Sequence, residues 1–345
     1  MPVPLPRVGS AASVALTLLL LAARCAPAGA GPAPAVAPPP TAAARAEPAA
    51  APPPPVQLRM GFVSLSWSSQ LPVAVADELG FLRDEGLEIE PQIVRSGGPV
   101  LVAMLLSGEI DVMTSGIEAQ LTAIAAGAPA VIVGGMEDRS DYSLVGAPGL
   151  RSVEDLRGQT VAATGAGTYS EFAVVEALRR RGLERDRDYT LRSVGNTSLR
   201  LAALSAGQVQ AVPLDPGDRF HAEDDGFPVL LELRDVIPEF PFSTLTARQE
   251  LIAQQPGAVV GLLRALSRAQ DVIRQDIDRA VALGKAHGLE GDPALEAKVM
   301  AYVAPDLHVQ LKKENLAALM AARGLTDSPD TVFDDRFLRQ AGLAP

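Results

Sequence analysis

Residues 103–113 read Ala-Met-Leu-Leu-Ser-Gly-Glu-Ile-Asp-Val-Met, and residues 202–212 read Ala-Ala-Leu-Ser-Ala-Gly-Gln-Val-Gln-Ala-Val. Both stretches place the end of a helix, a glycine and an apolar strand at identical offsets. A glycine suits the left-handed backbone conformation with which many helices end. Two similar α/β units in one chain predict two lobes that face each other.

The chain around these two stretches alternates short β-rich runs with helical runs. Strands are expected at residues 59–63, 87–94, 111–114, 130–133, 160–164, 189–194 and 209–214. The helices between them are expected at residues 71–79, 100–106, 117–126, 171–181 and 198–206. This order predicts an α/β fold in which each lobe is an open, mostly parallel sheet flanked by helices.

Two further β-rich stretches, at residues 142–147 and 241–247, are interpreted as strands that cross between the lobes. The resulting divisions are a first part of lobe 1 at 57–145, lobe 2 at 146–240, and a return to lobe 1 with C-terminal helices at 241–345. Pro256 suits the first position of a helix. An apolar stripe follows it and predicts that this helix packs on lobe 1; its residues are Val259, Val260, Leu263, Leu266 and Ile273.

Residues 1–30 are expected to form an export signal. Arg7 precedes an apolar run at 11–23, which is shorter than the about 20 residues that span a bilayer but fits a signal of about 7–15. Two processing routes are open. Ala-Gly-Ala at residues 28–30 suits ordinary cleavage, whereas Cys25, the only cysteine, stands where a bacterial lipoprotein carries its lipid. We favour lipid attachment at Cys25, although Arg24 occupies a position where that motif has a small residue.

Residues 31–56 consist almost entirely of alanine and proline, so they are expected to form an extended linker. Without residues 1–56 the chain keeps 27 basic and 40 acidic residues. An acidic body argues against nucleic acid as a partner. We expect a monomer that binds a small molecule.

The turns that follow the expected strands are rich in small and hydroxyl-bearing residues. In open parallel sheets, ligands bind beyond the carboxyl ends of the strands, where free N–H groups at helix starts suit polar acceptors. The predicted ligand-binding residues are Ser66, Trp67, Ser68, Ser69, Gly97, Thr114, Ser115, Gly167, Thr168, Tyr169, Asn196 and Asp215. For any one turn, a helix cap or turn residue is the alternative. Their recurrence at several turns favours a shared pocket.

Trp67 is the only tryptophan of the chain. Because it stands in a serine-rich turn, we expect it to form a wall of the pocket, with Tyr169 in a similar position on the opposite lobe. The alternative is that Trp67 belongs to the core.

The body of the chain does not carry the usual signatures of an enzyme. It contains no cysteine, and His221, His287 and His308 do not have metal-ligand spacing. Gly-Ala-Gly-Thr-Tyr-Ser at 165–170 resembles a dinucleotide fingerprint, but serine replaces its third glycine and no carboxylate ends the next strand. We therefore expect no catalytic residue, no metal and no cofactor.

Several motifs between residues 57 and 305 resemble one family. They include an Ala-rich helix leading to Gly-Phe-Leu-Arg-Asp-Glu-Gly at 80–86, Leu-Ser-Gly-Glu-Ile-Asp at 106–111, Ala-Gly-Ala-Pro at 126–129 and Val-Glu-Asp-Leu-Arg-Gly at 153–158. The chain resembles the ABC-importer binding proteins for nitrate, taurine, sulfonates and thiamine-pyrimidine precursors. The resemblance implies a type II periplasmic-binding-protein fold, with ligand-contacting turns at residues 66–69, 114–115 and 167–169.

The resemblance implies an extracytoplasmic solute-binding protein that delivers a small polar molecule or anion to a membrane permease. The predicted pocket turns contain no arginine, so a sulfonate or nitrate ligand is unsupported and an aromatic or heterocyclic ligand is equally open. The alternatives are a sensing domain for a membrane partner and a pyrimidine-precursor synthesis enzyme on the same fold. The single cysteine and the export signal count against that enzyme.

Overall fold

The computed structural model describes residues 54–63, 66–94 and 97–343. The predicted export signal, Cys25 and nearly all of the predicted linker lie outside these residues. Among the residues described, no helix combines the length and the apolar character needed to cross a membrane.

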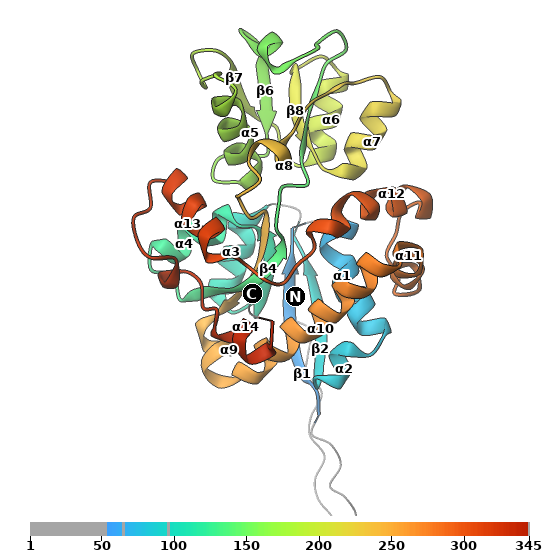
Figure 1. The fold of residues 1–345 in the computed structure, drawn as a ribbon, viewed down its shortest axis with the longest axis vertical. Coiled ribbons are helices and arrows are strands. Elements are labelled where there is room, and N and C mark those ends of the chain that lie inside the picture. Colours follow the sequence, from blue (N-terminus) through green and yellow to red (C-terminus); the bar gives the residue numbers. More distant parts are fainter. Residues whose placement is uncertain (1–53, 64–65, 95–96, 344–345) are drawn as a thin grey trace, which may run out of the picture. The chain divides into compact units, whose positions relative to one another are not determined.

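Within the described residues, ten strands form two five-stranded sheets, and Figure 1 shows their arrangement. The first sheet has the order β2-β1-β3-β10-β4, with β1 at Val56–Phe62, β2 at Leu87–Ile93, β3 at Val112–Gly116, β4 at Ala130–Glu137 and β10 at Ser243–Arg248. The second sheet has the order β7-β6-β8-β5-β9, with β5 at Ser143–Gly146, β6 at Thr160–Ala163, β7 at Thr190–Ser193, β8 at Ala211–Leu214 and β9 at Val229–Glu232. We call the first sheet with its helices lobe 1 and the second sheet with its helices lobe 2.

The two sheets share one topology. In each, the first three strands of the order pair in parallel, and the fourth strand, β10 or β5, pairs antiparallel with both neighbours. Gly108 and Gly207, the paired glycines of the repeated stretch, have φ angles of 79° and 69°. The predicted α/β fold of two sheets flanked by helices is therefore confirmed.

The chain passes between the sheets in two short segments, 138–142 and 237–242. Residues 138–142 join the end of β4 to β5, and residues 237–242 lead into β10. The stretches interpreted as crossing strands are β5 and β10 themselves. Each belongs to one sheet, and the crossing lies immediately before the strand.

Helices cover the sheets of both lobes. Lobe 1 has α1 at Trp67–Glu78, α2 at Phe81–Asp84, α3 at Gly98–Ser107 and α4 at Glu118–Ala125. Lobe 2 has a 3-10 turn at Val153–Leu156, α5 at Tyr169–Arg180, α6 at Thr197–Ser205, α7 at Pro216–Asp224 and α8 at Leu233–Val236. The C-terminal part has α9 at Gln249–Gln254, α10 at Pro256–Gln275, α11 at Ile277–Ala286, α12 at Pro293–Val303, α13 at Lys313–Ala322 and α14 at Arg336–Ala341, with 3-10 turns at Ala304–Asp306 and Pro329–Thr331.

The long helix α10 begins at Pro256, as predicted, and all five residues of its apolar stripe are buried. It packs against α1 and α2 of lobe 1 and against α14 of the C-terminal part. The C-terminal part also touches lobe 2, because α12 packs against α7 and the Tyr302 hydroxyl donates to Glu232 Oε2 at 2.8 Å. The C-terminal part thus contacts both lobes, α10 on lobe 1 and α12 on lobe 2.

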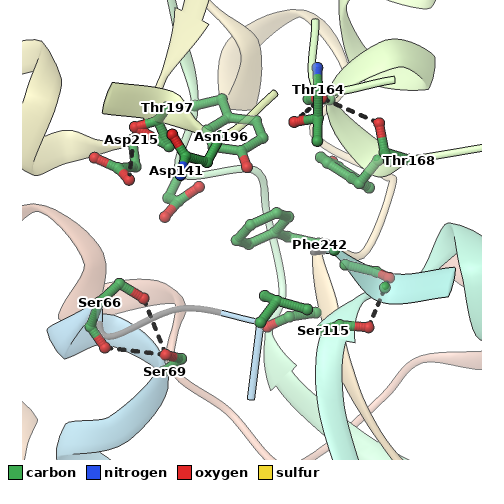
Figure 2. A pocket seen from close by; sticks show the side chains of 18 of the residues that line it. Ser66, Ser69, Ser115, Asp141, Thr164, Thr168, Asn196, Thr197, Asp215 and Phe242 are labelled. Carbon is green, nitrogen blue, oxygen red and sulfur yellow. Dashed lines mark hydrogen bonds between the residues drawn. The ribbon is translucent and has the colours of Figure 1, made fainter. Parts of the chain in front are cut away.

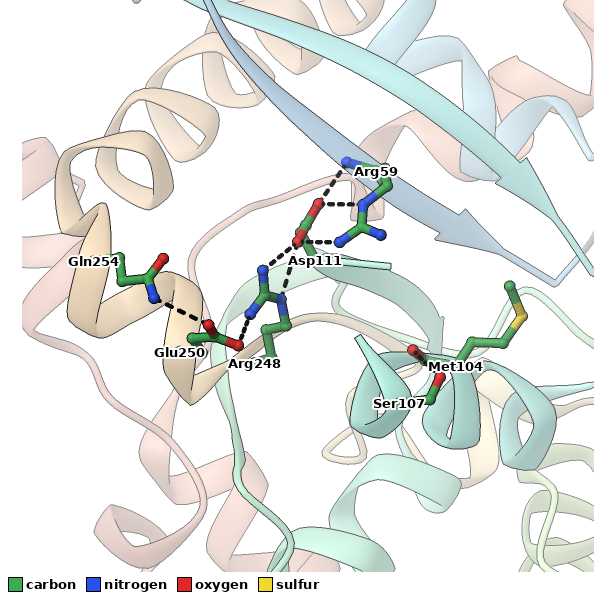
Figure 3. A network of polar contacts seen from close by, with 7 residues as sticks. All are labelled: Arg59, Met104, Ser107, Asp111, Arg248, Glu250 and Gln254. Carbon is green, nitrogen blue, oxygen red and sulfur yellow. Dashed lines mark hydrogen bonds and ion pairs between the residues drawn. The ribbon is translucent and has the colours of Figure 1, made fainter. Parts of the chain in front are cut away.

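Asp111, immediately before β3, bonds to residues of two other strands of lobe 1 (Figure 3). It accepts the backbone N–H of Arg59 on β1 at 3.0 Å, and it binds the guanidinium groups of Arg59 and of Arg248 on β10 at 2.8 and 2.7 Å. Burial opposes its ionisation, but these hydrogen bonds outweigh burial and lower the pKa of Asp111 to about 2. The Asp111 carboxylate therefore links β10 to β1 and β3 within the first sheet.

Candidate functional site

A cavity of about 150 Å³ is lined by residues of both lobes and of the two connecting segments. It lies where strands of both sheets turn into helices (Figure 2). Ten of the predicted ligand-binding residues line it: Ser66, Ser68, Ser69, Gly97, Thr114, Ser115, Thr168, Tyr169, Asn196 and Asp215. A cavity of this size accommodates a molecule of about the size of benzene.

Hydroxyl groups form the lobe 1 side of the cavity. The hydroxyl oxygens of Ser66, the N-cap residue of α1, and Ser69, in the first turn of that helix, are 2.9 Å apart. Ser115, at the end of β3, donates to Gln120 Oε1 at 2.9 Å, and Gln120 Nε2 in turn donates to Thr244 of β10 at 2.9 Å. These bonds fix the serine hydroxyls before any ligand arrives.

Three capped helix starts form the lobe 2 side. Thr168, Asn196 and Asp215 are the N-cap residues of α5, α6 and α7, and the side chain of each accepts a backbone N–H of the following turn. These three residues therefore cap helices, as the alternative interpretation predicted, and they also line the cavity. Thr197 also donates from Oγ1 to Asp215 Oδ2 at 3.0 Å, which orients that carboxyl.

The connecting segments contribute side chains that the sequence did not reveal. Glu137 ends β4, Asp141 and Tyr142 follow it, and Phe242 precedes β10; all four line the cavity. The rings of Phe242 and Tyr142 are 5.5 Å apart, and those of Phe242 and Tyr169 are 4.8 Å apart. The only signal for these residues was that they flank the expected crossings.

The carboxyl groups of the cavity resist ionisation. Burial, together with the nearby charge of Asp141, raises the pKa of Glu137 well above its usual range. Burial and the charge of Asp215 likewise raise the pKa of Asp141, and burial raises that of Asp215 itself. Carboxyl groups in such surroundings take up protons unless a cation compensates their charge.

Arg200, in the first turns of α6, is fully buried and lines the cavity. Its Nε donates to the carbonyl of Pro213 and its Nη1 to the carbonyl of Gly195, both at 2.8 Å, while Nη2 has no partner among the described residues. The predicted pocket turns contain no arginine, because Arg200 lies one turn further along the chain, within α6. Its side chain points back toward the helix start, a direction that helix geometry favours.

Trp67 does not line the cavity, so the prediction that it forms a pocket wall is wrong. Its side chain is 3% exposed and belongs to the hydrophobic core. The indole Nε1 donates to the carbonyl of Glu290 at 2.6 Å. The ring lies so close to α11 that a Cβ placed on Gly284 would be 2.7 Å from Cζ3 of Trp67. The C-terminal helices therefore cover the Trp67 side chain, which was expected to contact a ligand.

Gly167 does not line the cavity either. It has a φ of 74° in an exposed loop, where its N–H donates to Glu171 Oε2 at 2.8 Å. The glycine shapes the turn before α5, and the neighbouring Thr168 and Tyr169 reach the cavity in its place.

Among residues 54–63, 66–94 and 97–343, no group of three or more His, Cys, Asp or Glu side chains has an arrangement that could hold a metal ion. The cavity thus offers hydroxyls, carboxyls, one guanidinium and aromatic rings. These groups can bind and orient a small polar molecule.

The sequence model of the NMT1-like family matches residues 51–284. The chain belongs to the NMT1-like family. It is 25% identical over 223 residues to a protein of Brucella abortus (strain 2308) that carries the name "Putative binding protein", a match covering 63% of this chain and 66% of that relative.

Solved structures share the fold of this NMT1-like chain. The alkanesulfonate-binding protein SsuA from Xanthomonas axonopodis pv. citri, bound to MOPS, has a TM-score of 0.65 at 23% identity, covering 84% of this chain and 98% of that one. The periplasmic nitrate-binding protein NrtA from Synechocystis has a TM-score of 0.66 at 15% identity, covering 84% and 88%. These similarities confirm the expected periplasmic-binding-protein fold.

Proposed function

We propose that this protein is the extracytoplasmic solute-binding component of an ABC import system. The observation that carries the proposal is the cavity between two lobes of the same topology, lined from both sides by helix starts. A ligand held by both lobes favours the state in which they are closed around it, because it makes more contacts there. Delivery to a membrane permease would follow from recognition of that closed state, with the protein acting as a monomer and without nucleic acid.

We also propose that the protein binds its ligand without changing it. The pocket side chains are held by hydrogen bonds to helix N–H groups, to neighbouring side chains and to backbone carbonyls. Residues of both lobes contribute contacts, as expected for capture and release. The Brucella and SsuA relatives are named as binding proteins, which supports the same role.

The test is a thermal-shift screen of small polar molecules on the purified protein, followed by calorimetry of those that stabilise it. A true ligand should raise the melting temperature, since binding to the folded state alone stabilises it by mass action. Mass spectrometry after prolonged incubation should return the ligand intact. Turnover that scales with protein concentration would contradict the binding-only role.

For localisation, we propose export followed by lipid attachment at Cys25. In a bacterial host, the protein should lose its N-terminus and remain with the membrane fraction, and Cys25→Ala should release it. If that variant stays with membranes, the anchor is refuted while export is not.

A further inference from the structure

The charged side chains that line the cavity are mostly acidic. Among the described residues, Glu137, Asp141 and Asp215 face a single cation, Arg200. If all three carboxyls ionise, the lining keeps a formal excess of two negative charges. Within a buried site such an excess is unfavourable until a positive charge enters it.

Two of these carboxyls retain a free acceptor atom. Asp141 is 3% exposed and Glu137 is 4% exposed. Asp141 Oδ1 and Glu137 Oε1 have no hydrogen-bond partner among the residues that the structure describes. Because buried polar atoms are nearly always paired in folded proteins, these two oxygens indicate a donor that the chain itself does not supply.

Arg200 does not fill this role. Its Nε and Nη1 donate to the carbonyls of Pro213 and Gly195, and its guanidinium carbon is 5.6 Å from the centre of the Tyr142 ring. Its Nη2, like Asp141 Oδ1 and Glu137 Oε1, has no partner among the described residues, so it pairs with neither of these oxygens. It reduces the pKa shifts of Asp141 and Asp215 only as a minor contribution behind burial. With Arg200 in place, ionisation of all three carboxyls would still leave the lining with an excess of negative charge.

Aromatic rings give a second, independent indication. Tyr142, Tyr169 and Phe242 form one cluster at the cavity, and Figure 2 shows the Phe242 ring between the serines of lobe 1 and Asp141 with Asp215. Aromatic faces attract organic cations within about 6 Å of the ring centre. Carboxylates and aromatic rings in one small cavity suit a ligand that is both organic and positively charged.

We propose that the ligand of this cavity carries a positively charged nitrogen, and that Asp141 with Glu137 binds this group beside the Phe242 ring. The proposal rests on the solute-binding function proposed above and names its ligand class. Since both carboxyls and the ring flank the segments that connect the lobes, the cationic group lies at the hinge. The opposite end of the ligand then faces the serine hydroxyls of lobe 1.

The raised pKa values agree with this assignment. Without a ligand, burial and the neighbouring charge of Asp215 favour the protonated form of Asp141, while Arg234 and Arg200 oppose it. Burial and the charge of Asp141 likewise favour the protonated form of Glu137. A cation entering the cavity favours the ionised form instead. Binding of a cationic ligand should therefore release protons, whereas a neutral ligand should release none.

The test compares cations with neutral molecules of the same shape on the purified protein. The pairs are choline with 3,3-dimethylbutan-1-ol and benzylamine with benzyl alcohol, and methanesulfonate and nitrate represent anions. We expect a cation to bind and its neutral partner to bind at least roughly tenfold more weakly. Calorimetry in two buffers of different ionisation enthalpy should report proton release on cation binding to the unaltered protein.

Asp141→Asn should weaken cation binding by roughly tenfold or more. Asp224→Asn, at an exposed acid on α7 away from the cavity, is the matched control and should bind normally. Glu137→Gln serves as a second variant if Asp141→Asn does not fold by circular dichroism. Equal binding of a cation and its neutral partner, or full affinity in both folded variants, overturns the proposal.

Native mass spectrometry of the protein as isolated separates this proposal from the proposed function. A co-purified cation supports both. A bound anion or neutral molecule, or binding of methanesulfonate or nitrate alone, overturns the ligand class but leaves solute binding intact. If no molecule co-purifies and no probe of any charge binds, both are overturned.

Discussion

Trp67 and Tyr169 occupy matching places in the two lobes, yet their surroundings differ. Each is the first residue of the helix that follows the second strand in its sheet order, α1 after β1 and α5 after β6. Both side chains are buried in the hydrophobic core, but only Tyr169 also lines the cavity. The same local position therefore serves the core in both lobes and the site in one of them.

The C-terminal helices explain the difference. They pack α10, α11 and α12 against α1 of lobe 1, whereas the start of α5 in lobe 2 meets the end of β3 across the cavity. A Cβ on Gly116 would lie 2.7 Å from the Cβ of Tyr169, so the absence of a side chain at Gly116 permits that approach. The C-terminal helices α10 to α12 therefore pack around Trp67 and its helix, and among the described residues they do not pack on the matching start of α5.

The largest expected effect comes from Trp67→Ala. It should lower the free energy of unfolding by about 3–5 kcal/mol, because it leaves a large void between α1 and α11. Once folded, the variant should bind ligand normally. Denaturant unfolding and calorimetry below the melting temperature would measure the two properties.

Tyr169→Ala is the matched variant in lobe 2. It should weaken ligand binding by about 1–3 kcal/mol, the scale of a lost aromatic contact. If the Trp67→Ala protein is stable but does not bind ligand, then Trp67 contributes to ligand binding as Tyr169 does, and the contrast between the two positions is wrong.

A second contrast between the lobes concerns Asp111 in lobe 1 and Gln210 in lobe 2. Gln210 matches Asp111 in the repeated stretch, and both accept a backbone N–H from the neighbouring strand, from Thr160 at 3.1 Å and from Arg59 at 3.0 Å. Only Asp111 also binds two arginine side chains. The neutral side chain keeps the shared hydrogen bond without the ion pairs.

Asp111→Asn should therefore cost more than Gln210→Ala. We expect a loss of about 2–3 kcal/mol for the first, because two partly buried arginines lose their counter-charge. For the second we expect about 1 kcal/mol, the value of a single hydrogen bond. Chemical denaturation of both variants measures the difference, and equal losses would mean that the ion pairs contribute nothing.

Acid should affect lobe 1 through the same residue. The pKa of Asp111 in the folded protein, about 2, is below the unfolded value of about 3.9. Its stabilising contribution is therefore complete above about pH 4 and is lost as the pH falls toward 2. Unfolding measured across that window should show a smaller pH dependence in Asp111→Asn than in the unaltered protein. Identical curves would contradict the assignment.

The smallest expected effect concerns the helix starts. In lobe 2, Asn196 caps α6 by accepting the N–H of Leu199 at 3.0 Å, whereas the N-cap residue of the matching α3 in lobe 1 is Gly97, which has no side chain. Asn196→Ala should cost about 1 kcal/mol and Asn196→Gly only a few tenths. Thermal unfolding would measure both. No loss of stability in Asn196→Ala would show that the cap hydrogen bond does not stabilise α6.

The sequence by itself determined the architecture. The repeated stretch with Gly108 and Gly207, the alternation of strands and helices, and Pro256 at the start of α10 are local signals, since periodicity and glycine conformation act over a few residues. The polar turns were local signals too, because helix caps and turn residues follow a strand at fixed positions. Ten residues of the cavity were found in this way.

The tertiary structure alone decided which side chains face the cavity and which are covered. Trp67 could not be assigned from its turn, because the helices that enclose it lie more than 200 residues later in the chain. Arg200 was missed because its side chain returns to the cavity from within a helix. The acidic character of the site arises where Glu137 and Asp141 meet Asp215 from another lobe. Burial and charge depend on neighbours distant in the chain, and a local pattern does not contain them.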